Sequence, residues 1–253
     1  MPAPPFLSLV IPAYNEASII AGTLTSAADF LNSQPFDWEL LVADDGSTDA
    51  TASIIQLHAH RDPRIKLLKL PHGGKGWAVR NGMLQARGLY RFLCDADLSM
   101  PIQQLSRFLP PQGPNADVVI ASREGPGARR LGEPWTRHVM GRLFNLLTRL
   151  FALSRVSDSQ CGFKSFTAAA AQQLFPLQRL NGFGFDVELL FLSRKLGITV
   201  AQVPIDWYYR HGGKVRPLQD SLRMIGDLLA IRWASIRGRY NRAASAVQQQ
   251  VPP

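Results

Sequence analysis

Two aspartates, one residue apart, follow an apolar run in the first half of the chain. Asp95 and Asp97 flank Ala96 directly after the run YRFLC. Like charges this close repel each other at a strand end, which costs stability unless a cation or hydrogen-bond donors balance them. Carboxylate oxygens are the ligands that hard divalent cations prefer, and such a cation also binds diphosphates. Asp95 and Asp97 are therefore candidate ligands for Mg²⁺ or Mn²⁺, with capping of a following helix as the simpler alternative.

A second acidic cluster, DDGSTD at 44–49, follows another apolar run. Gly46 permits a tight turn, and Ser47, Thr48 or Asp49 can cap the next helix. Capping does not account for both Asp44 and Asp45, which come before the turn. One of these two carboxylates is then free to accept hydrogen bonds from a base or a ribose.

The segment HGGKGWAVRNG at 72–82 looks like a phosphate-binding loop. A Walker loop requires Ser or Thr after Gly-Lys, and Gly76 stands at that position, so we reject a P-loop. Lys75 and Arg80 lie near the expected start of a helix, where they either face phosphates or are simply solvated. His72 shows no spacing typical of a ligand, and we expect it at the surface.

The elements that must position these residues alternate along the first half of the chain. Strand-like runs and helical patterns alternate from Phe6 to Ser122, which predicts an α/β fold with an open, mostly parallel sheet and flanking helices. The expected strands are 6–12, 38–44, 65–70, 90–97 and 117–122, and the expected helices are 17–31, 49–60, 75–87 and 101–109. Ligands of such sheets bind beyond the carboxyl ends of the strands. The polar clusters at 13–16, 44–49 and 95–97 all follow strands, so we expect them to form one site.

The second half elaborates the first. A loop rich in Gly, Pro and Arg over 123–134 precedes further expected elements. These are a helix through about residue 153, a helix over 185–196, a strand pair within 198–209 and an amphipathic helix from residue 217. The tail at 241–253 has too little apolar content to fold and is expected to be disordered. The expected division is a main domain at 1–216, an amphipathic helix at 217–240 and the tail.

Composition indicates a basic globular protein. The 253 residues are 46% hydrophobic, and 28 Lys and Arg against 19 Asp and Glu give a net charge of +9. Such a surface attracts phosphates, nucleic acid or anionic lipid. Two cysteines are too few for a disulfide framework, and the beginning of the chain does not resemble a signal peptide. We therefore expect a cytoplasmic protein.

Two stretches combine an apolar stripe with basic flanks. They are 135–155 and 217–240, and neither reaches the roughly 18 uninterrupted apolar residues of a spanning helix. Such helices either pack on their own core or lie in a lipid interface. We expect peripheral attachment to an anionic membrane surface, on its cytosolic face.

Taken together, the motifs resemble those of a known family. The runs are LSLVIPAYNE, VADDGSTD, GGKGWAVRNGMLQARG, DADLS, ASRE, DSQCGFKSF, FGFDVELLFLSRKLGI and VPIDWYYRHGGKVRP. In order and spacing, over about residues 6–232, they resemble family 2 glycosyltransferases of the GT-A fold. The closer resemblance is to the polyprenyl-phosphate branch, with dolichyl-phosphate glucosyltransferases first and dolichyl-phosphate mannose synthases next. This resemblance implies a nucleotide-sugar donor, a divalent metal and inversion at the anomeric carbon.

The sequence departs from the glucosyltransferase pattern at Ser159, where that pattern typically has Thr. The resemblance also implies roles for individual residues. It implies nucleotide-sugar binding by Pro12, Tyr14, Glu16, Asp44, Asp45 and Lys214, metal binding by Asp95 and Asp97, contact with the acceptor phosphate by Arg123 and Arg137, and acidic positions near the donor sugar or reaction centre at Asp158, Asp186 and Glu188. To the nucleotide-sugar group we add Lys75 and Arg80 from their own setting.

These residue types fit transfer of a hexose, expected to be glucose from UDP-glucose, to a polyprenyl phosphate. An acceptor phosphate with a second pKa of about 6 is largely ionised at neutral pH, so it needs positioning by arginines more than a base. Asp158 therefore need not act as a general base. The alternatives are another donor such as GDP-mannose, or a soluble acceptor. A basic nucleic-acid-binding module is a different class, but it leaves three acidic clusters unexplained, so no nucleic acid is expected as a partner.

Overall fold

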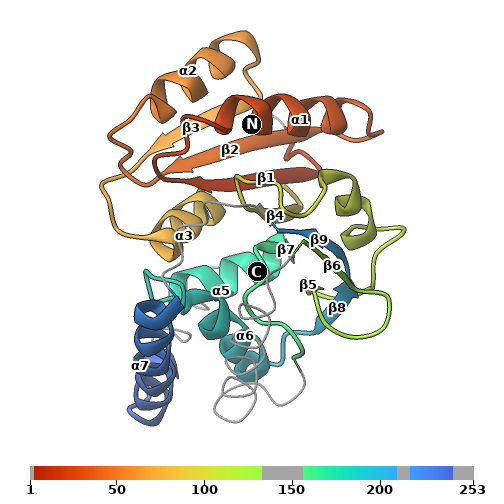
Figure 1. Cartoon of the computed structure of the whole chain (residues 1–253). Helices are drawn as coiled ribbons and strands as arrows, with labels where there is room; N and C mark the ends of the chain where they lie inside the picture. The colour runs from red at the N-terminus through yellow and green to blue at the C-terminus, as the bar shows by residue number, and fades with distance from the viewer. Residues whose placement is uncertain (1–2, 133–155, 210–216, 242–253) are drawn as a thin grey trace.

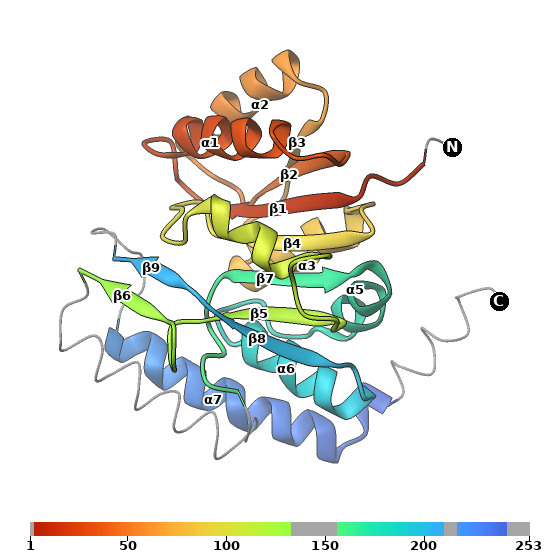
Figure 2. The same ribbon diagram turned by 90° about the vertical axis from the view of Figure 1, so that its right-hand side faces the viewer.

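A seven-stranded sheet runs through the molecule (Figures 1 and 2). The computed structural model describes residues 3–132, 156–209 and 217–241, with side chains of the last range from residue 223 onward. The strands are β1 (Leu7–Ala13), β2 (Trp38–Asp44), β3 (Ile65–Lys69), β4 (Tyr90–Cys94), β5 (Val118–Ser122), β7 (Phe163–Thr167) and β8 (Val200–Pro204). Their order is β3-β2-β1-β4-β7-β5-β8, and β7 alone of the seven runs antiparallel to its neighbours. The expectation of a mostly parallel α/β sheet is confirmed.

The strand pair expected within 198–209 is wrong in its pairing. Two strands do form there, but β8 joins β5 in the main sheet, whereas β9 (Asp206–Tyr208) pairs with β6 (Arg129–Leu131) in a separate two-stranded sheet. Only Ile205 separates β8 from β9, and one residue cannot reverse the chain into a hairpin. The chain therefore continues forward and changes sheets.

Helices connect the strands close to the expected positions. They are α1 (Ile20–Asn32), α2 (Thr51–Arg61), α3 (Lys75–Gln85), α5 (Ala168–Leu174), α6 (Phe185–Leu196) and α7 (Pro217–Ile236), with 3₁₀ turns η1 (Ile102–Phe108) and η2 (Phe175–Leu177). The helix expected over 101–109 is the 3₁₀ helix η1. The elements β6, β7, α5 and η2 were not expected from the sequence, β6 lying within the segment 123–134 that was expected to be a loop. The helix expected over 135–155 lies outside the described residues.

The core has two parts, one on each face of the sheet. Leu9 and Phe92 belong to one part, with residues of α1, α2 and η1, whereas the next residues along each strand, Val10 and Leu93, belong to the other, with residues of α3, α5, α6 and α7. This alternation follows from the two-residue period of a strand. Burial on both faces explains why these strands read as continuous apolar runs.

Helix α7 packs beside α6, at the end of the sheet away from β3 (Figure 2). It buries Met224, Leu228, Ile231 and Ala234 and exposes Ile225, Leu229, Trp233 and Ile236. The helix beginning at 217 is thus part of the common core on one side and apolar toward solvent on the other. No helix in the described parts of the chain is long and apolar enough to cross a bilayer.

Candidate active site

The loops that follow β1 and β2 are joined by hydrogen bonds at the carboxyl edge of the sheet. The Asn15 N–H donates to Ser47 Oγ at 2.9 Å, and the Glu16 N–H donates to Thr51 Oγ1 at 2.7 Å. Asn15 itself has φ 50°, a left-handed conformation that Asn tolerates better than most residues. The expected meeting of the 13–16 and 44–49 clusters is confirmed. Pro12 and Tyr14 lie in the same strand end, both half-buried.

Asp44 and Asp45 are both 3% exposed, and each holds a loop. Asp44 accepts hydrogen bonds from the N–H and hydroxyl of Ser47 in its own turn. Asp45 accepts the N–H groups of Gly73 at 2.8 Å and Gly74 at 2.9 Å, just before α3. These contacts fix the loop that carries Lys75, so part of the role of Asp45 lies within the protein.

His72 also lies at this edge of the sheet, although the sequence analysis assigned it no role. Its ring stacks on Tyr14 with centroids 4.3 Å apart, and its Nδ1 lies 2.8 Å from Asp45 Oδ2. The side chain is more than half exposed, as expected for a surface histidine. Tyr14 and His72 therefore present a flat aromatic surface beside Asp45, the kind of surface on which a planar base stacks.

Charged side chains of both signs gather beyond β4. Lys75, the first residue of α3, places Nζ 2.6 Å from Asp95 Oδ1. Burial works to lower the pKa of Lys75, but the neighbouring carboxylates of Asp95, Asp186 and Asp97 outweigh it and raise that pKa. The structure thus brings together one lysine and three acids that the sequence analysis had placed in different motifs.

Asp186 belongs to this cluster through a buried ion pair. Its Oδ1 lies 2.6 Å from Lys164 Nζ, and the two side chains are 4% and 1% exposed. Burial raises the pKa of Asp186, against the opposing effect of Lys164 and Lys75. The sequence analysis quoted the motif that contains Lys164 but gave this lysine no role. The nearby aromatic residues Phe163 and Phe166 are the signal that could have indicated a buried segment, in which a lysine needs a charged partner.

Gly162 makes room for the first metal-ligand candidate. A Cβ atom on Gly162 would lie closer than 3.0 Å to the carboxylate of Asp95, so any larger residue there would displace that carboxylate. The Asp95 N–H also donates to the Gly162 carbonyl at 3.1 Å. Sequence reasoning missed this residue because it missed β7, which begins at the next position and places residue 162 beside 95.

Asp158 and Arg123, assigned to different roles from the sequence, are partners. Arg123 Nε lies 2.6 Å and its Nη2 2.9 Å from the two carboxylate oxygens of the fully buried Asp158. Burial acts to raise the pKa of Asp158, but Arg123 overcomes it and lowers that pKa to about 2. An acid this strong is a poor proton acceptor, which agrees with the expectation that Asp158 need not be a general base.

Two expected site residues do not join the clusters at the strand ends. Glu188 follows Asp186 by two helical positions, about 200° around the axis. Its buried carboxylate accepts the N–H groups of residues 179 and 180 and the hydroxyl of Tyr240. Arg80 donates to the carbonyls of Phe175 and Pro176 at 3.1 and 3.4 Å. Arg137 and Lys214 lie outside the described residues.

The acidic residues suit a metal that takes part of its ligands from elsewhere. Among the described residues, no group of three or more His, Cys, Asp or Glu side chains could hold an ion. Asp95 and Asp97 supply hard oxygen donors, and the glycine beside Asp95 keeps space open for its carboxylate. This set fits Mg²⁺ or Mn²⁺ held by one or two carboxylates, with phosphate oxygens and water completing the shell.

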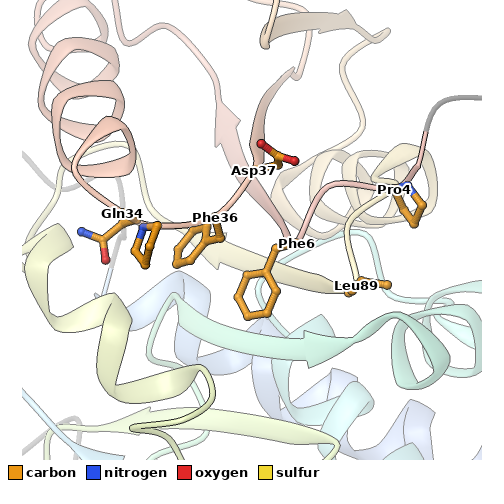
Figure 3. A pocket seen from close by; sticks show the side chains of 7 residues that line it. Pro4, Phe6, Gln34, Phe36, Asp37 and Leu89 are labelled. Atoms are coloured by element: carbon orange, nitrogen blue, oxygen red, sulfur yellow. The ribbon is translucent and has the colours of Figure 1, made fainter.

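A hollow of about 530 Å³ lies at the other edge of the sheet (Figure 3). It is lined by residues at the amino ends of β1, β2 and β4, among them Phe6, Phe36, Asp37 and Leu89. Asp37 is the one charged side chain in this lining. The hollow therefore lacks the paired charges of the opposite edge and is not part of the candidate site.

Comparisons with known proteins agree with this geometry. The family model described as Glycosyl transferase family 2 matches residues 8–175. Dolichyl-phosphate beta-glucosyltransferase of Dictyostelium discoideum is 32% identical over 92% of this chain and 76% of the relative. The enzyme of the same name from Saccharomyces cerevisiae is also 32% identical, over 93% of this chain and 76% of the relative.

A solved structure shares the fold. It is glucosyl-3-phosphoglycerate synthase from Mycobacterium tuberculosis, in complex with Mn²⁺, UDP and glucosyl-3-phosphoglycerate. The TM-score is 0.63 at 22% identity, covering 90% of this chain and 80% of the other. With a family model that matches more than half of the residues and a mostly parallel sheet with the site at its carboxyl edge, the chain belongs to glycosyltransferase family 2 and has the GT-A fold.

Proposed function

We propose that this glycosyltransferase transfers glucose from UDP-glucose to a polyprenyl phosphate, with a divalent metal and with inversion at the anomeric carbon. The observation that carries the proposal is the row of charges along the strand ends, with Asp95 and Asp97 at one end and the Arg123–Asp158 pair at the other. One end suits a metal-bound diphosphate, and the other offers a guanidinium for an acceptor phosphate. The dolichyl-phosphate beta-glucosyltransferases among the relatives support the same substrates.

On the donor side, the loops after β1 and β2 form the nucleotide site. Tyr14 and His72 offer a stacking surface for the base, with Asp45 beside His72 and Asp44 at the end of β2. We assign contact with the diphosphate to Lys75, because its ammonium group lies beside Asp95, a proposed metal ligand. Asp95 and Asp97 would hold the metal, which when bound neutralises the charge that develops on the departing diphosphate.

On the acceptor side, Arg123 orients the attacking phosphate. An oxygen of the acceptor phosphate forms the new bond to C1 of the sugar while the bond from C1 to the diphosphate breaks. The electron pair of the broken bond leaves with UDP. The acceptor is already ionised, so no protein base has to remove a proton. Asp158 stays ionised beside Arg123 and fixes the direction of the guanidinium. To Asp186, held by Lys164, we assign the orientation of the sugar.

Attachment to the cytosolic face of an anionic membrane completes the proposal. The outer face of α7 exposes Leu229, Trp233 and Ile236 at 57%, 54% and 78%. Arg237 lies over the Trp233 ring at 4.2 Å, so a cation accompanies the apolar stripe. An apolar stripe with basic neighbours is typical of helices that lie in a lipid interface, where a polyprenyl phosphate is also found.

A donor and acceptor survey tests the function. The full chain is incubated with radiolabelled UDP-glucose or GDP-mannose and a polyprenyl phosphate, with EDTA, Mg²⁺ or Mn²⁺, and the label in the organic phase is counted. We expect label from UDP-glucose alone, and only with metal. Label from GDP-mannose instead would show that the donor is wrong, and label only in water-soluble products would show that the acceptor is wrong.

The variant Asp97→Asn tests the metal role. It removes a charged ligand while keeping the shape, so we expect transfer to fall by at least about 100-fold. Unchanged circular dichroism and melting serve as controls, because a helix-capping role would instead lower stability and leave specific activity. Full turnover at saturating Mn²⁺ would contradict the assignment.

A further inference from the structure

The first turn of α6 carries Asp186 but receives no cap from its own sequence. Its N-cap residue is Gly184, which has no side chain to accept the exposed N–H groups of the turn. The carboxylate of Asp227 in α7 lies against the Gly184 backbone instead. A Cβ atom on Gly184 would lie closer than 3.0 Å to this carboxylate, so Asp227 rests directly on the glycine backbone. The cap of α6 thus comes from another helix.

Asp227 is half-buried, and partial burial disfavours an ionised carboxylate. It is next in sequence to the buried Leu228, on a helix that otherwise faces the core with apolar residues. Burial raises its pKa, against the opposing effect of the nearby Gly184 backbone. The charge is favourable there because the amino end of a helix carries a partial positive charge. Asp227 is also one of the charges that interrupt the apolar run of α7 in the sequence.

A second contact ties the same turn to the segment that follows α7. The Tyr240 hydroxyl donates to Glu188 Oε1 at 2.7 Å, and both side chains are buried. Glu188 lies in the first turn of α6 together with Asp186. Two polar anchors therefore fix this turn from outside, one at Gly184 and one at Glu188, with Asp186 between them.

We propose that Asp227 is a positioning residue that caps α6 across the helix interface and thereby holds Asp186 against Lys164 in the active site. The catalytic consequence rests on the proposed function, whereas the capping does not. Loss of the cap frees the turn at Gly184, and the carboxylate of Asp186 then samples positions away from Lys164. Tyr240 acts from the other side through Glu188.

Hydrogen exchange and kinetics test this in the full-length protein. We expect Asp227→Ala to speed amide exchange at residues 184–188 about five- to tenfold, and to leave exchange in α3 unchanged. We expect kcat to fall about tenfold, with the KM for the nucleotide sugar within about twofold of wild type. Asp227→Asn keeps an oxygen acceptor and should restore most of both properties. The control Leu228→Ala lowers stability from the neighbouring position without removing the cap.

A double variant isolates the contact itself. Gly184→Ala places a methyl group against the Asp227 carboxylate and should reduce kcat on its own, but it should add little to Asp227→Ala, because the carboxylate is then gone. Additive losses, unchanged exchange at 184–188, or equal kcat losses in Leu228→Ala and Asp227→Ala would each overturn the proposal. A wild-type protein with no transfer from any donor would contradict the proposed function, while the exchange result would still decide the capping.

Discussion

The pairing of Arg123 with Asp158 changes the role that each residue can have in the site. Considered separately, one is a phosphate-binding cation and the other an acid near the reaction centre. Bound together at 2.6 and 2.9 Å, they form one unit in which the carboxylate fixes the direction of the guanidinium. Such a unit presents positive charge along a defined direction without the entropy of a free arginine. We therefore propose that Asp158 contributes to acceptor binding through Arg123.

This pairing predicts a specific dependence of stability on pH. The pKa of Asp158 is about 2 in the folded protein, against an ordinary value of 3.8, so the ionised acid stabilises the fold above about pH 4. At 1.36 kcal/mol per unit, this contribution is roughly 2.5 kcal/mol, and it is lost as the pH falls from about 4 through about 2. In Asp158→Asn no such titration remains. In urea unfolding, the stability difference between wild type and variant should shrink by most of that amount from pH 5 to pH 2, and a constant difference would contradict the ion pair.

Gly162 gives a second prediction at the scale of single atoms. In Gly162→Ala the new methyl group occupies the place of the Asp95 carboxylate, which must rotate away from the metal position. We expect Mn²⁺ affinity in the presence of UDP to weaken about 10- to 100-fold, as for residues that orient metal ligands in other proteins. Calorimetric titration measures this without reference to turnover.

The matched control is Gly22→Ala in α1. No atom lies within 4 Å of the added methyl group at this exposed helical position. Alanine should therefore raise stability by about 0.5–1 kcal/mol and leave Mn²⁺ binding unchanged. Equal Mn²⁺ affinity in both variants would show that Asp95 does not ligate the metal.

The residue types of the site could be predicted from the sequence, but their partners could not. Asp44, Asp45, Asp95 and Asp97 stand at strand ends, and the rule that parallel strands share a carboxyl edge places them together. Partners such as Lys164 and Gly162 depend on which strand lies beside β4. That neighbour is β7, an antiparallel strand inserted between two parallel ones, and no local pattern encodes the insertion.

At the scale of elements, strands that contain several polar residues were harder to predict than strands that are apolar runs. The strands β1, β2 and β4 follow from apolar runs that are buried on both faces, a strong signal. The five residues of β7 include Lys164, Ser165 and Thr167, whose polar character conceals a buried strand. Pairing with β4 and β5 supplies the burial, so the strand exists because of its neighbours rather than its own propensity.

Helix α7 shows why a periodic pattern leaves two interpretations open. Its apolar residues cover both the inner face, with Leu228 and Ile231, and the outer face, with Leu229 and Trp233. A single stripe would have indicated either a core helix or an interfacial one. Because the inner face is part of the core, removal of everything after residue 216 would expose that core, and the truncated chain cannot test membrane binding.

For the whole molecule, the nucleotide loops and the outer face of α7 lie in different regions. The loops follow β1 and β2, whereas α7 lies at the end of the sheet away from β3 (Figure 2). Donor binding and lipid attachment should therefore be separable by substitution, although a lipid acceptor requires both.

The variant Leu229→Ser with Trp233→Ser tests that separation. Both side chains are more than half exposed, so we expect melting and UDP binding to stay within error, while affinity for anionic vesicles falls at least about tenfold. Transfer to a long polyprenyl phosphate in vesicles should fall with it, and transfer to a short, water-soluble one should not.

Leu228→Ala is the opposite control, expected to cost about 2–5 kcal/mol of stability. Because each basic residue near the surface adds about 1 kcal/mol, salt should weaken wild-type binding without abolishing it. If the wild-type protein does not float with anionic vesicles at low salt, the membrane surface is not its partner.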